Sequence, residues 1–179
     1  MRMFLAKQML THIFNLTSSQ LLFALSGFLF WLIAAKFYSV EQIGLGASLI
    51  SAANLILFFS SFPFGTMSRF LPQQKNRINY IYSVFVYSLV LTSLGLIIFL
   101  IIVALKCPNL SSVLTVKGLS IFSFVLFVML VYYNLDVVFS SSKKTDLVLK
   151  KNFIQDYLRL AALALLPVLG AYGIFLANG

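Results

Sequence analysis

The sequence predicts an all-α protein, a polytopic membrane bundle of about five transmembrane helices. The first observation is composition: of 179 residues, 61% are hydrophobic and 9% are charged, and the mean hydropathy is +1.00. Soluble domains carry about a quarter charged residues, so these values exclude a water-soluble fold. The second observation is length, because a span with its loop uses about 30 to 35 residues. Five spans therefore fill residues 1–179 as a single transmembrane domain and leave no room for a soluble enzymatic domain.

Each predicted span corresponds to one apolar run of the sequence. Three runs of 27 or 28 residues carry no charge, a fourth is interrupted by Asp136, and a fifth carries Asp156 and Arg159 in its first turns. At about 1.5 Å per residue, each run is long enough to cross a bilayer with some tilt. The predicted spans are 10–35, 43–68, 79–105, 118–142 and 153–177.

The positions of the basic residues predict the orientation. Nine Lys and Arg residues fall at the N-terminus and in the second and fourth connections. Three others, Lys36, Lys106 and Lys117, fall in the first and third connections. Loops rich in Lys and Arg face the cytoplasm. We therefore expect a protein of the cytoplasmic membrane with its N-terminus in the cytoplasm and, after five spans, an external C-terminus.

The residue types exclude several classes of chemistry. One cysteine and one histidine do not suffice for a disulfide or a multi-residue metal site. The sequence contains no catalytic Ser/His/Asp set and no phosphate-binding glycine loop, so it predicts neither an enzyme nor a cofactor. The net charge of +9 comes from short basic clusters between apolar runs, which favours anionic membrane lipids over nucleic acid as the partner.

Two features of the second span suggest irregular backbone or close packing. Pro63 and Gly65 predict a kink, which is either structural or part of a cavity wall. Gly44, Ser48 and Ala52 recur every four residues, a spacing that lets another helix approach closely.

The charged residues inside or at the ends of the spans are the more specific candidates for a functional site. Asp136 is expected near the inner boundary of the hydrocarbon, paired with Arg159, Asn134 or water. Asp156 and Arg159, three residues apart, can also pair with each other. The alternative for all three charges is interfacial anchoring and pairing between helices. Arg69 either anchors to lipid phosphates or lies at the inner mouth of a cavity, where it could bind a phosphate.

Two segments resemble a known family. AAKFYSVEQIGLGASLISAANLILFFSSFPFGTMSRFLPQ resembles the first two spans of polysaccharide flippases of the O-antigen and teichoic-acid type. These flippases belong to the MATE-like multidrug/oligosaccharidyl-lipid/polysaccharide exporter superfamily. A later segment is similar to the connection between the fourth and fifth helices of that family: LDVVFSSSKKTDLVLKKNFIQDYLRL. The matching residues are Ala34, Ala35, Lys36, Ser39, Glu41, Gly44, Gly65 and Arg69.

The resemblance implies an incomplete N-terminal lobe that flips a lipid-linked oligosaccharide or polysaccharide precursor by alternating access. It implies Arg69 and Arg159 as cationic residues for the substrate. The residues themselves make Asp136, Asp156, Pro63 and Gly65 candidates for structural or coupling roles. The implied partners are membrane lipids, the polyprenyl-linked glycan, and the missing C-terminal half or glycosyltransferases. Two alternatives are a fragment of a cation-coupled multidrug exporter and a small non-transporting assembly partner for other membrane proteins.

Overall fold

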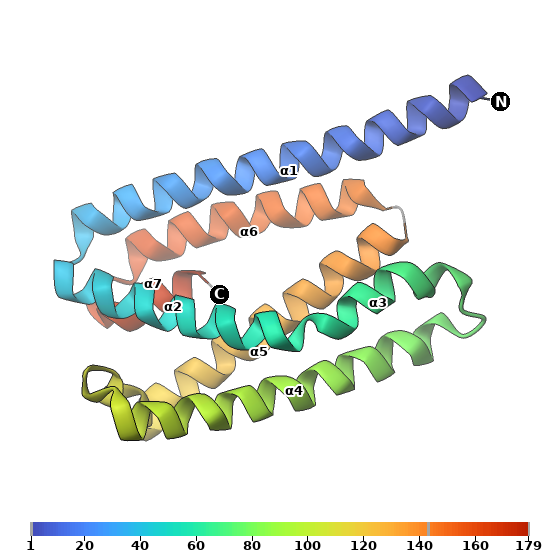
Figure 1. The fold of residues 1–179 in the computed structure, drawn as a ribbon. Coiled ribbons are helices and arrows are strands. Elements are labelled where there is room, and N and C mark those ends of the chain that lie inside the picture. The colour runs from blue at the N-terminus through green and yellow to red at the C-terminus, as the bar shows by residue number, and fades with distance from the viewer. Residues whose placement is uncertain (1, 143, 179) are drawn as a thin grey trace.

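The computed structural model describes residues 2–142 and 144–178, and within these ranges every regular element is a helix (Figure 1). Four of the described helices, α1, α2, α4 and α5, are long and apolar enough to cross a membrane. The chain is therefore a helical membrane protein by the length and composition of its helices, as predicted. The elements are α1 (Arg2–Phe37), α2 (Val40–Ser60), α3 (Phe62–Phe70), η1 (Leu71–Gln73), α4 (Arg77–Lys106), η2 (Pro108–Leu114), α5 (Val116–Ser141), α6 (Thr145–Leu165), η3 (Pro167–Leu169) and α7 (Ala171–Asn178).

The helices run back and forth between two ends of the bundle (Figure 1). One end holds the start of α1 and the α3–α4 and α5–α6 connections, and we call it the basic end because Lys75, Arg77 and Lys144 lie there. The opposite end holds the α1–α2, α4–α5 and α6–α7 connections. The connections that the sequence assigns to one side of the membrane thus share one end of the bundle.

Polar caps define where several helices begin. The Ser39 hydroxyl accepts a hydrogen bond from the Gln42 backbone N–H at 3.3 Å, and the Gln42 side chain accepts one from the Ser39 N–H at 3.1 Å. Thr115 caps α5 in the same way, by accepting from the Gly118 N–H at 3.1 Å. These caps satisfy backbone donors that have no partner within the helix, so they fix the ends of the spans.

The second predicted span is divided into two helices. Pro63 lies in the first turn of α3, where its missing N–H costs no helical hydrogen bond. The break therefore falls at Ser61, between α2 and α3, next to the predicted kink. Gly65 is exposed, and a Cβ added there would meet nothing within 4 Å, so no close approach of a neighbouring helix requires this glycine.

The fifth predicted span, 153–177, is not one continuous helix. Helix α6 ends at Leu165, the chain turns through η3, and α7 returns into the bundle. The reason is local: a proline at 167 disfavours helical backbone at the residue before it, and Gly170 adopts φ +56°, a conformation that favours glycine.

Close contacts place α7 beside α2 and parallel to it. A Cβ added to Gly170 would lie 3.1 Å from the Gln42 amide nitrogen, and one added to Gly46 would lie 3.0 Å from the Ile174 Cβ. A Cβ at Gly173 would overlap the backbone oxygen of Leu166. Glycines thus let α7 pack against both α2 and the end of α6. The glycine that α2 uses is Gly46, whereas Gly44 of the predicted small-residue stripe faces open space.

Tyr38 fixes the α1–α2 turn to the end of α6. Its buried hydroxyl donates a hydrogen bond of 3.0 Å to the Leu163 carbonyl oxygen. Burial raises the pKa of this hydroxyl, which keeps it protonated as a donor.

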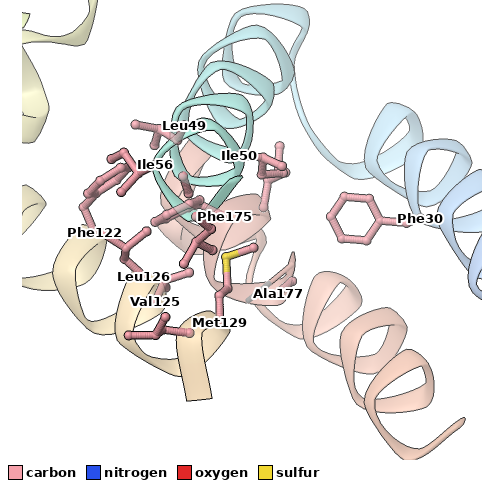
Figure 2. Packing of buried hydrophobic residues seen from close by; sticks show 14 of the residues in the cluster. Phe30, Leu49, Ile50, Ile56, Phe122, Val125, Leu126, Met129, Phe175 and Ala177 are labelled. Atoms are coloured by element: carbon pink, nitrogen blue, oxygen red, sulfur yellow. The ribbon is translucent and has the colours of Figure 1, made fainter. Parts of the chain in front are cut away.

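The core lies where α2, α5 and α7 meet (Figure 2). Phe122 of α5 stacks between two rings, with centroids 5.2 Å from Phe175 of α7 and 5.0 Å from Phe99 of α4. Leu49 and Ile56 of α2 are buried in the same cluster. This packing holds α7 in the interior of the bundle and brings its last residues to the cavity described next.

Candidate functional site

A cavity of about 390 Å³ lies between α1, α2, α5 and α6 and reaches the end of α7. The side chains that line it fall into an apolar and a polar group. Aromatic and aliphatic side chains contribute Phe23, Trp31, Ile50, Met129, Tyr132 and Tyr133. Amides contribute Gln20, Asn54, Asn152, Gln155 and Asn178, and the charged residues are Asp136 and Arg159. A mixed wall of this kind is typical of sites that bind small polar molecules.

Arg159 presents its guanidinium to this cavity from α6. The group lies over the Phe30 ring at 4.3 Å and near the Phe23 ring at 5.8 Å, distances typical of cation–π contacts. Its Nε atom is buried and has no hydrogen-bond partner, and it forms no ion pair with any carboxylate side chain in the described ranges. A guanidinium held by rings in this way keeps its donors available for an anion, which it can bind with two parallel hydrogen bonds.

Asp136 pairs with Lys151 and not with Arg159 or Asn134, the protein partners that the sequence suggests. The Lys151 Nζ lies 2.8 Å from Asp136 Oδ1. Asp136 lies five residues before the end of α5 and Lys151 six residues after the start of α6, so these antiparallel helices bring them face to face. Of the partners that the sequence left open for Asp136, which were Arg159, Asn134 and water, the structure shows neither protein residue paired with it.

Lys151 has further partners that use its charge and its donors. Its Nζ lies 3.0 Å from the centroid of the Tyr132 ring and donates to the Tyr132 backbone oxygen at 3.4 Å. The Tyr132 hydroxyl in turn donates to the side-chain oxygen of Asn152. These contacts form a polar seam, made of Tyr132, Asp136, Lys151 and Asn152, that joins α5 to α6 along one wall of the cavity.

Asp156 lies on α6 one turn before Arg159 but does not pair with it. No ion pair joins the two side chains in this structure, although the sequence suggests one. Asp156 is buried, and its Oδ2 atom has no hydrogen-bond partner in the described part of the protein. It is not among the residues that line the cavity.

The remaining sequence candidates lie elsewhere. Arg69 is exposed in the last turn of α3, at the basic end, with its guanidinium 5.6 Å from the centroid of the Phe70 ring. Neither Arg69 nor the pair Pro63 and Gly65 lines the cavity. The structure therefore brings Arg159 and Asp136 to one site and leaves the α3 residues outside it.

Part of the cavity wall that α1 and α2 contribute is exposed. Gln20 and Asn54, on these two helices, are both exposed although each lies in a helix segment apolar enough to span a membrane. The sequence does not single out three of the lining residues, because they carry no charge: Asn54, Gln155 and Trp31. The signal for Asn54 is present, because a lone amide in an apolar span usually has a polar partner.

No cluster of three or more His, Cys, Asp or Glu residues that could hold a metal ion occurs within the described ranges. No protein-family model, no curated protein and no solved structure matches the chain. The resemblance to polysaccharide flippases therefore stays a prediction.

Proposed function

We propose that the chain takes part in moving a lipid-linked oligosaccharide or polysaccharide precursor across the cytoplasmic membrane by alternating access. The observation that carries this proposal is the guanidinium of Arg159 in a cavity of a membrane bundle, where its Nε has no hydrogen-bond partner and no ion pair to a carboxylate is present among the described residues. A diphosphate head is the part of such a substrate that hydrocarbon solvates worst. A guanidinium that forms no ion pair with a carboxylate of the described residues offsets that cost at the point where the head would cross.

The neighbourhood of Arg159 strengthens this assignment. Lys151, the other cation beside the cavity, is already neutralised by Asp136 and is held over Tyr132. An incoming phosphate thus meets one available guanidinium. Phe23 and Phe30 hold this group in place, and a preorganised guanidinium loses less side-chain entropy when it binds. Arg159 is therefore the substrate-binding residue in this proposal, and Arg69 is a lipid anchor at the bundle end.

The proposal includes an orientation and a partner. The basic end faces the cytoplasm, because Lys and Arg concentrate in its connections. Because the cavity residues Gln20 of α1 and Asn54 of α2 are exposed, the proposal has the head enter between these helices while the polyprenyl tail stays in lipid. The chain acts as one lobe, and a second lobe completes the pathway across the membrane, in the way that the resemblance implies.

A flipping assay tests this function. Proteoliposomes that contain the complete gene product receive a polyprenyl diphosphate glycan with a fluorescent label on its sugar, and dithionite bleaches the label on the outer leaflet. We expect faster bleaching of the inner pool than in protein-free vesicles, a strong decrease with Arg159→Gln, and no change with Arg69→Gln. Bleaching no faster than in protein-free vesicles would contradict the proposal.

A further inference from the structure

The connection between α3 and α4, at the basic end of the bundle, carries three exposed cations (Figure 1). Arg69 lies in the last turn of α3, Lys75 in the connection itself, and Arg77 at the first residue of α4. Residues 42–135 of the sequence contain no Asp or Glu. None of the three cations forms an ion pair with a carboxylate side chain in the described part of the protein. The charge of these three residues, which we call the α3–α4 cation patch, is therefore available to an anion from outside the chain.

The length of α4 places this patch at the depth of the lipid phosphates. Helix α4 has 30 residues, from Arg77 to Lys106. At 1.5 Å per residue this is about 45 Å. The hydrocarbon of a bilayer is about 30 Å thick, and about 40–45 Å with both headgroup layers. A helix of this length that crosses the bilayer has its two ends in the two headgroup layers, so Arg77 lies in one of them and Lys106 in the other.

The fold holds the connection in place. Leu71 of η1 is 2% exposed and belongs to the hydrophobic core, and η1 packs against both α4 and α5. The Gln74 N–H donates to the Leu71 carbonyl oxygen at 3.3 Å, and the Asn76 side-chain oxygen accepts from the Asn79 N–H at 3.3 Å. The cations thus extend from a fixed turn, which lowers the conformational entropy that is lost when a ligand binds.

Arg69 and Arg77 lie on two helices that pack against each other and meet at this turn. The axes of packed helices are about 8–10 Å apart. Two long side chains at such neighbouring helix ends can reach the same phosphate group. A guanidinium binds phosphate with two parallel hydrogen bonds, so a shared phosphate would link the end of α3 to the start of α4.

An exposed apolar column continues from the patch along α4. Ile78, Tyr82 and Val86 recur every four residues, so they lie on one face of the helix, and all three are exposed. The column begins next to Arg77 and runs into a segment apolar enough to span a membrane. A ligand that fits both features has an anionic group joined to a hydrocarbon chain. A phospholipid has this chemistry, whereas free phosphate and nucleic acid do not.

We propose that the α3–α4 cation patch binds the headgroup of an anionic phospholipid, whose acyl chain lies along Ile78, Tyr82 and Val86. The proposal extends the anchoring role of Arg69 to a defined lipid site, and it does not depend on the cavity. The break at Ser61 separates α3 from α2, so a lipid shared by Arg69 and Arg77 also holds α3 against α4.

Lipid titration followed by native mass spectrometry tests this site. The full chain in detergent receives dioleoylphosphatidylglycerol, dioleoylphosphatidylcholine or inorganic phosphate, and the dissociation constant of the first bound molecule is measured. The two lipids have the same acyl chains, but the choline group cancels the phosphate charge. We expect phosphatidylglycerol to bind more than about tenfold more tightly than phosphatidylcholine, because each cation close to an anionic lipid contributes about fivefold. Inorganic phosphate at millimolar concentration should not displace it.

Matched variants at the two ends of the bundle assign the site. Arg69→Gln and Arg77→Gln should each weaken phosphatidylglycerol binding about fivefold and leave phosphatidylcholine binding unchanged. Lys106→Gln and Lys117→Gln, at exposed cations of the opposite end, should change neither. Equal losses at both ends, or equal affinity of the wild type for the two lipids, would overturn the proposal. Displacement of phosphatidylglycerol by inorganic phosphate would show a site for soluble anions and would also overturn it.

A measurement on the wild type keeps the test independent of how the variants fold. The cations are exposed, so salt screens them, and the Debye length falls to about 3 Å at 1 M salt. We expect 1 M sodium chloride to lower the affinity for phosphatidylglycerol to that for phosphatidylcholine. A preference that persists unchanged in 1 M salt would contradict a site made by these cations.

Discussion

Lys151 and Asp136 form the ion pair that holds α5 and α6 together beside the cavity. Both side chains are largely buried, with 17% and 27% of their surface exposed. Removal of one partner from such a pair leaves an uncompensated charge, whereas removal of both charges is often tolerated. The pair therefore makes a specific prediction at the residue scale.

Lys151→Met should destabilise the folded protein by about 3 kcal/mol, because Asp136 is left without its counter-charge. The double variant with Asp136→Asn should recover most of this loss. The free energy of unfolding in detergent measures both effects. Equal stability of Lys151→Met and the wild type would show that the pair does not act as described. The control is Lys144→Met, at an exposed lysine directly before α6.

The charged residues could be recognised from the sequence, but their partners could not. A charge in an apolar run is conspicuous, so Asp136, Asp156 and Arg159 are found at once. The choice of partner depends on how α5 and α6 are rotated about their axes, and the sequence contains no direct record of this rotation. The assignment of Asp136 to Lys151 therefore required the structure.

At the scale of elements, α7 contributes to the wall of the cavity. This short helix turns back beside α2 and reaches the cavity with Asn178. A hydropathy scan reads 153–177 as one span because all the residues after Arg159 are uncharged. The signals that divide it are the proline at 167 and Gly170, which act through local backbone geometry and not through hydropathy.

Gly173→Ala should destabilise the protein by about 1–3 kcal/mol, because the added methyl group overlaps the Leu166 backbone and forces α7 to move. Thermal unfolding in detergent gives the comparison. Gly44→Ala is the matched control, since a Cβ there meets nothing within 4 Å. If the two variants unfold at the same temperature, the close packing of α7 against α6 is not present.

At the scale of the whole molecule, α1 packs along α6 while α2, α3, α4, α5 and α7 form the rest of the bundle (Figure 1). The cavity lies between these two parts. The sequence predicts the four long apolar helices and the end at which basic residues gather, but not the division of 153–177 among α6, η3 and α7. It could not predict the cavity, because the pairing of α1 with α6 joins segments more than a hundred residues apart.

The proposed orientation predicts which end of the bundle a reagent outside the cell can label. Cys107, the single cysteine, lies at the end opposite the basic connections, where α4 ends. A membrane-impermeant maleimide should label it on intact cells. Gln74→Cys in a Cys107→Ser background should be labelled only after permeabilisation, because Gln74 lies in the α3–α4 connection. Labelling of both positions from the same side would rule out this topology.

The availability of Arg159 for an anion is the central claim, and chemical modification tests it most directly. Phenylglyoxal reacts with accessible guanidinium groups, and mass spectrometry of the digested protein reports each arginine separately. We predict that Arg159 is modified in the free protein and protected by farnesyl diphosphate, while Arg69 and Arg77, outside the cavity, react equally with and without it. An Arg159 that reacts to the same extent in both samples, or that never reacts, would contradict the account.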